Sequence, residues 1–186
     1  MKWVLEVGFS ETYEQLVEEM KLWLEGTDSV SMAVLVKFTE NPPYKCPVSF
    51  DQDLEKLNIP SESREVRSRD VIAGENFGPV SYRGQQWVGD ISEAFIEIWK
   101  IDADTNTAKR QGDRINLLDM AQDSIQFELS AFLTISPQND RTISLGLDKF
   151  RKLLKYEIKQ LAVERCQDML RNRAKRIGEG LDDRDY

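Results

Sequence analysis

The sequence predicts an α/β fold with a mixed sheet, and three features carry this prediction. Residues 3–7 and 30–38 are apolar runs of strand length, and residues 10–26 between them show helical spacing of apolar side chains. A strand, a helix and a strand joined by short connections are typical of a parallel βαβ unit with a right-handed crossover. Residues 95–147 then hold several strand-like runs separated by turn residues, which predicts antiparallel strands added to that start.

The opening strand is expected over Trp3–Val7, buried in the sheet and ending at Gly8. It carries one carboxylate, Glu6, although charged side chains are rare in buried strands unless they are paired. Ser10 is placed to cap the following helix with its hydroxyl group. Apolar side chains recur along that helix on one face, namely Leu16, Met20, Trp23 and Leu24.

The stretch from residue 40 to residue 90 is the least regular part of an α/β domain that we expect to span residues 1–147. It holds five of the six prolines and several glycines, so it is predicted to be an irregular insertion. A loop of this length within a domain is usually functional or disordered. A solvated flap and a substrate-binding segment both fit this composition.

Antiparallel strands are predicted after the insertion. Residues 95–100 and 114–118 are expected to form a hairpin. Residues 127–133 and 142–147 are two further candidate strands, joined by a Pro-Gln-Asn-Asp turn.

A long basic helix is predicted from Asp148 to Ile177, with Gly178 as its stop and an acidic tail over 178–186. The helix carries ten Lys and Arg against four Asp and Glu, whereas residues 1–147 carry 14 against 25. A basic helix on an acidic body can contact nucleic acid or pair with the protein's own acidic surface. The net charge of −8 favours the second interpretation, because it repels phosphate backbones.

Composition excludes several kinds of chemistry. The 186 residues include no histidine and only two cysteines, Cys46 and Cys166, which rules out histidine-dependent triads and the usual zinc sites. An enzyme of this composition would be expected to use Mg2+ or Mn2+ on oxygen ligands. No apolar run approaches the ~20 residues of a membrane span, and no signal-peptide pattern is present. We therefore expect an intracellular protein, cytoplasmic or nuclear, with free thiols and no contact with a membrane.

Three short motifs resemble a known family. They are EVGFSE at Glu6–Glu11, LWLEG at Leu22–Gly26 and FIEIW at Phe95–Trp99. Together they resemble the core of the PD-(D/E)XK nuclease superfamily, and most closely the Uma-type restriction-endonuclease-like domain and its uncharacterised fungal relatives. The similarity runs from Trp3 to about Leu161. It implies a restriction-endonuclease-like core and metal-dependent cleavage of phosphodiester bonds.

The resemblance also implies roles for individual residues. Glu6 matches the strand carboxylate that binds Mg2+, and the carbonyl of Val7 is a further candidate metal ligand. The lysine of the family usually lies two residues after this glutamate, where this chain has Gly8. In some members the lysine lies instead on the following helix, and Lys21 matches that place. Glu19, on the same helix, is a weaker polar neighbour. The family's second metal ligand is an Asp upstream of the Glu, yet only five residues precede Glu6 and none is an Asp. Either a preceding piece lies outside this sequence, or the site is degenerate.

Three functions remain open at this point. The first is a Mg2+-dependent nuclease-like domain centred on Glu6 and Lys21. A purely structural ion pair between these two residues, without catalysis, is the alternative interpretation. The second is a non-catalytic protein-interaction or dimerisation module on the same fold, with the long helix as its contact surface. The third is a nucleic-acid binder, for DNA or RNA, that contacts phosphates through the basic residues of that helix: Lys149, Arg151, Lys152, Lys155, Arg171, Arg173 and Arg176.

Overall fold

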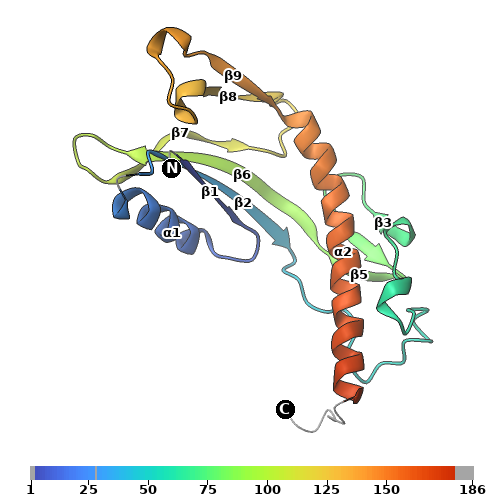
Figure 1. Ribbon diagram of the computed structural model, residues 1–186. Coiled ribbons are helices and arrows are strands. Elements are labelled where there is room, and N and C mark those ends of the chain that lie inside the picture. The colour runs from blue at the N-terminus through green and yellow to red at the C-terminus, as the bar shows by residue number, and fades with distance from the viewer. Residues whose placement is uncertain (1–2, 28, 179–186) are drawn as a thin grey trace. The chain divides into compact units, whose positions relative to one another are not determined.

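The computed structural model describes residues 3–27 and 29–178 (Figure 1). The chain divides into two compact units. The first unit consists of Met1–Thr39 and Glu93–Arg151, and the second of Glu40–Ser92 and Lys152–Tyr186. Residues 40–90, which were predicted to be an insertion in the α/β domain, thus belong to the same unit as most of the C-terminal helix. The predicted acidic tail, residues 178–186, lies outside the described residues except for Gly178.

A mixed four-stranded sheet forms the centre of the first unit, in the order β1-β2-β6-β7. Strands β1 and β2 are parallel and are connected by helix α1, whereas β6 and β7 form an antiparallel hairpin. The predicted α/β class with a parallel start and antiparallel strands is therefore confirmed. The bounds are β1 Trp3–Gly8, α1 Tyr13–Gly26, β2 Met32–Asn41, β6 Asp90–Ile101 and β7 Ala108–Asn116.

Helix α1 begins later than the sequence suggested, because Thr12 and not Ser10 is its N-cap. The Thr12 hydroxyl accepts a hydrogen bond from the Gln15 amide at 3.2 Å, and the Gln15 side chain accepts one from the Thr12 amide at 3.0 Å. This reciprocal capping box satisfies two free amides at the start of the helix, whereas a lone hydroxyl satisfies one.

The core of the first unit lies between α1 and one face of the sheet. Leu16 packs with Leu35 and Phe95, and Met20 packs near Ala33. Gly8 allows the close approach of the helix, since a Cβ at this position would lie 2.2 Å from a methyl carbon of Leu16.

The remaining strands of the first unit form a separate two-stranded antiparallel sheet. Strand β8 spans Ser124–Glu128 and β9 spans Thr142–Gly146. The strand predicted over 127–133 starts and ends earlier than expected, because a 3-10 turn at Leu129–Ala131 follows β8.

The second unit contains a three-stranded antiparallel sheet that the sequence did not predict. Its strands are only three or four residues long, which is too short to show an alternating pattern: β3 Val71–Ala73, β4 Val80–Tyr82 and β5 Gln85–Val88. Helix α2 spans Leu147–Gly178 and confirms the predicted long helix. Among the described residues, no helix has both the length and the apolar character that crossing a membrane requires.

Candidate functional site

Glu6 lies in the middle of β1 and is partly buried on the side that faces α1. Its Oε1 accepts a hydrogen bond from the indole nitrogen of Trp23 at 2.5 Å. Glu19 and Thr27 line the same surface depression as Glu6 and Trp23. The structure thus places next to Glu6 the helix carboxylate that was expected to be the weaker neighbour.

Lys21 is not brought to Glu6. It lies two residues before Trp23, which is about 200° around a helix axis, and its side chain is exposed. Among the described residues, no salt bridge joins Lys21 to Glu6. The side chain of Val7 points to the opposite face of the strand from Glu6 and is 52% exposed.

A different lysine is found near the start of α1. Lys37 is the in-register partner of Gly8 on the neighbouring strand, so its side chain leaves the sheet on the same face as that of Glu6. Its Nζ donates to the carbonyl of Phe9 at 3.1 Å and to that of Phe38 at 2.5 Å. Burial lowers the pKa of Lys37, although the negative charge of Glu11 opposes this shift.

The predicted metal site remains a prediction. In the part of the chain that the structure describes, no cluster of three or more Asp, Glu or Cys side chains is arranged to hold a metal ion. Glu6 and Glu19 are the two carboxylates near the expected position, and Glu6 already accepts the hydrogen bond from Trp23. Glu6 and Glu19 are thus the carboxylates available to such a site, and Lys21 does not line the same depression.

Glu97 is the carboxylate that is fully buried in this sheet, with 1% of its surface exposed. It accepts hydrogen bonds from Tyr13 at 3.0 Å and Trp99 at 3.0 Å. It also pairs with Arg110 at 3.1 Å and Arg114 at 3.0 Å. The FIEIW motif contains this glutamate. Its two arginine partners lie on β7, and no sequence pattern around them indicates that they pair with it.

These contacts keep Glu97 ionised. Burial raises its pKa, but the hydrogen bonds from Arg114, Trp99 and Tyr13 outweigh burial and leave the pKa below its usual value. The pKa of Tyr13 is raised in turn by burial and by its bond to Glu97. Because its oxygens are already occupied by donors from α1, β6 and β7, this carboxylate fastens the helix to the sheet.

The outer face of β1 is apolar and exposed. Trp3, Leu5 and Val7 alternate with the inward-facing residues and are 37%, 49% and 52% exposed. Strand β1 ends the sheet, and no described strand pairs with its outer edge. The expectation that this strand is buried is therefore wrong for one of its faces, because α1 covers only the other.

The β8–β9 hairpin continues this apolar surface. Phe127 lies opposite Ile143, and Ile125 lies opposite Leu145, so these four side chains share one face of the hairpin. Ile143 and Leu145 remain 37% and 54% exposed. The opposite face is polar, with a hydrogen bond between Gln126 and Ser144.

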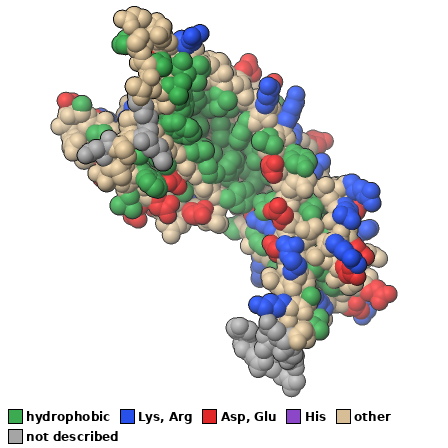
Figure 2. Space-filling view, in the orientation of Figure 1, with side chains coloured by type: hydrophobic (Ala, Val, Ile, Leu, Met, Phe, Trp, Pro, Cys, Tyr) green, Lys and Arg blue, Asp and Glu red, His purple; other side chains and the backbone are tan. Residues whose placement is uncertain are grey.

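Aromatic contacts connect the hairpin to β1. The ring of Phe132 lies 5.3 Å from that of Phe127 and 5.4 Å from that of Trp3, both in edge-to-face geometry. Figure 2 shows hydrophobic side chains gathered in a hollow below the hairpin. We use the name apolar hollow for the exposed apolar side chains of β1 and β9, which the contacts of Phe132 and Phe127 connect: Trp3, Leu5, Val7, Ile143 and Leu145.

No protein-family model, curated protein or solved structure matches this chain. The resemblance to restriction-endonuclease-like domains therefore remains a prediction based on the short motifs. The functional interpretation rests on the geometry of the site.

Proposed function

We propose that the protein is a non-catalytic interaction module that forms a homodimer through β1 and the apolar hollow. The observation that supports this proposal is the exposure of Trp3, Leu5 and Val7 on an edge strand. Proteins usually protect such edges with lysine, proline or a covering segment. Strand β1 has neither lysine nor proline, and its only charge, Glu6, is turned toward Trp23 on the other face.

A second copy of the chain is the partner that fits this edge. Antiparallel pairing of two β1 strands about a two-fold axis at Leu5 would place Trp3 opposite Val7 of the other copy. The same register would place Glu6 opposite Val4, so that like charges do not face each other. Both partners would contribute the same strand edge, as a two-fold interface requires.

The area of the hollow sets the expected strength. The five exposed side chains present roughly 400 Å2 of apolar surface, within the range of the largest patches on soluble proteins. A stable interface buries about 800 Å2 per partner. The hollow supplies about half of that area, so we expect a weak, reversible dimer.

Sedimentation over a concentration series tests the proposal. The informative variant is Leu5→Glu, which places a charge at the proposed two-fold axis without disturbing the core. Leu22→Glu is the matched control, because Leu22 is 72% exposed on α1, outside the hollow. We expect the wild type and the control to dimerise as concentration rises and Leu5→Glu to remain a monomer. A wild type that is monomeric throughout, or a Leu5→Glu variant that still dimerises, would refute the proposal.

Metal-dependent cleavage at Glu6 is a second candidate, favoured by the placement of Lys37. This lysine lies beside Gly8, the position at which the resembled family carries its lysine. The test is calorimetric titration of Mn2+ into the wild type and into Glu6→Gln. Binding that is lost in the variant would support the candidate, and absent or unchanged binding would exclude it.

A further inference from the structure

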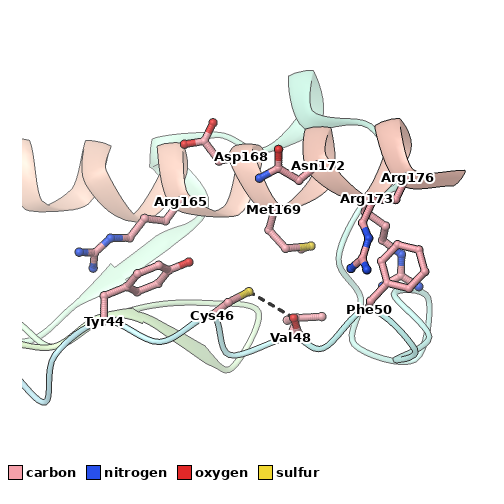
Figure 3. A pocket seen from close by; sticks show the side chains of 10 residues that line it. All are labelled: Tyr44, Cys46, Val48, Phe50, Arg165, Asp168, Met169, Asn172, Arg173 and Arg176. Carbon is pink, nitrogen blue, oxygen red and sulfur yellow. Dashed lines mark hydrogen bonds between the residues drawn. The ribbon is translucent and has the colours of Figure 1, made fainter. Parts of the chain in front are cut away.

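The second unit contains a cavity of about 390 Å3 between α2 and the segment from Tyr44 to Phe50 (Figure 3). Helix α2 contributes three arginines to its wall, Arg165, Arg173 and Arg176. The volume is within the range of about 300–1,000 Å3 that is usual for small-molecule sites. Nothing in the proposed dimer involves this cavity.

At one end of the cavity, Arg165 contacts three other residues of the second unit. It forms a two-pronged ion pair with Glu40 at 2.7 and 2.8 Å and donates to the carbonyl of Trp87 at 2.9 Å. Its guanidinium also lies 3.9 Å from the centre of the Tyr44 ring. The charge of this arginine is therefore balanced within the protein.

The other end of the cavity is different. Arg173 and Arg176 lie 5.3 and 4.6 Å from the centre of the Phe50 ring, and Figure 3 shows all three side chains gathered there. One terminal nitrogen of Arg173 donates to the carbonyl of Gln52 at 2.7 Å. Its other terminal nitrogen is buried and has no hydrogen-bond partner. A buried charged donor without an acceptor is costly, so this nitrogen is suited to an acceptor supplied by a ligand.

Nearby carboxylates do not fill that role. Asp168 lines the cavity but pairs with Arg171 on the same helix. The pKa of Asp51 is lowered first by a hydrogen bond from Ser49, and the charge of Arg173 contributes least. Arg173 and Arg176 thus bring two positively charged side chains to the end of the cavity near Phe50.

The rest of the lining is suited to a planar group. The wall between the two ends is formed by the apolar or weakly polar side chains of Cys46, Val48 and Met169 (Figure 3). Asn172 adds an amide that can both donate and accept hydrogen bonds. An aromatic base can pack against such a wall, while arginines bind phosphate through paired N–H groups.

We propose that this cavity binds a nucleoside monophosphate, with the phosphate at Arg173 and Arg176 and the base toward Tyr44. The same chemistry is available from a free nucleotide or from one unit of a single-stranded nucleic acid. In both cases the phosphate accepts hydrogen bonds from the arginines, and the base replaces water on the apolar wall.

The test is calorimetric titration with adenosine 5′-monophosphate, adenosine, inorganic phosphate and a short oligoadenylate. Arg173→Gln removes the unpaired donor, and Arg176→Gln is a second variant of the same end. Lys152→Gln is the matched control, because it makes the same change of charge on an exposed residue of α2 that does not line the cavity.

We expect the monophosphate to bind the wild type more tightly than adenosine or phosphate alone. Its affinity should fall roughly tenfold or more in Arg173→Gln or Arg176→Gln, as for the loss of a charge-assisted hydrogen bond, and stay unchanged in Lys152→Gln. If the oligoadenylate binds more tightly than the monophosphate, the ligand is single-stranded nucleic acid. If the two bind equally, the ligand is a free nucleotide. Absence of binding by all four probes, or an equal loss in Lys152→Gln, would overturn the proposal. The Leu5→Glu variant should bind as the wild type does, which separates this site from the dimer.

Discussion

Replacement of Glu97 by Gln should destabilise the first unit by removing the charge that joins α1 to the sheet. The carboxylate accepts five hydrogen bonds from four side chains. An amide can still accept from Arg110 and Arg114 through its oxygen. Its NH2 group would then face the indole N–H of Trp99, and two donors cannot bond to each other.

The magnitude follows from these contacts. The unpaired Trp99 donor costs about 1–3 kcal/mol, and each hydrogen bond to a charged group is worth about 1.5–3 kcal/mol. The side chains of Arg110 and Arg114 are 41% and 36% exposed, so water can replace part of what they lose. We therefore expect Glu97→Gln to lower the free energy of unfolding by about 2–4 kcal/mol.

Urea unfolding followed by tryptophan fluorescence measures this loss, with Glu18→Gln on the exposed face of α1 as the control. The pKa of Glu97 is depressed in the folded state, so its contribution is full above the unfolded pKa and disappears as pH falls through the folded one. The difference between wild type and variant should thus shrink below about pH 4.5. A difference under about 0.5 kcal/mol at neutral pH, within the range of ordinary surface substitutions, would refute this account of the network.

Three further predictions concern other parts of the chain. Glu40→Ala leaves Arg165 largely buried without its carboxylate and should lower the free energy of unfolding by about 3–5 kcal/mol, as measured in urea. Gly8→Ala places a methyl group against α1 and should cost about 1–3 kcal/mol in the same assay. In the native protein, iodoacetamide should label Cys46, which is exposed, and spare Cys166, because burial raises the pKa of the Cys166 thiol to about 12; mass spectrometry reads out the site.

The two substitutions have controls in the same chain. Glu164→Ala, an exposed position beside Arg165 on α2, should change stability little. Gly26→Ala has open space around its Cβ and should be neutral or slightly stabilising. Costs equal to those of Glu40→Ala and Gly8→Ala would contradict the packing arguments. Early labelling of Cys166 would show that its surroundings open readily.

Local periodicity was enough to predict the first strand, the helix after it and the long C-terminal helix. The stripe that contains Leu16, Met20 and Leu24 is buried as its spacing indicated, and α2 begins and ends within one residue of the predicted bounds. The same helical spacing could have excluded Lys21. Side chains two positions apart point to nearly opposite sides of a helix, so if Trp23 faces Glu6, then Lys21 faces away from it.

The sequence by itself thus determined the α/β class and the main elements, because these depend on residues within one turn or one strand of each other. Only the tertiary structure decided which face of β1 is left uncovered, since this depends on the position of the strand at the sheet edge. It also decided the partners of buried charges: Arg114 reaches Glu97 from another strand, and Arg173 reaches the backbone of Gln52 across 121 positions of the chain. Such pairs leave no periodic trace in a single sequence, because they are created by the folding of distant segments against each other.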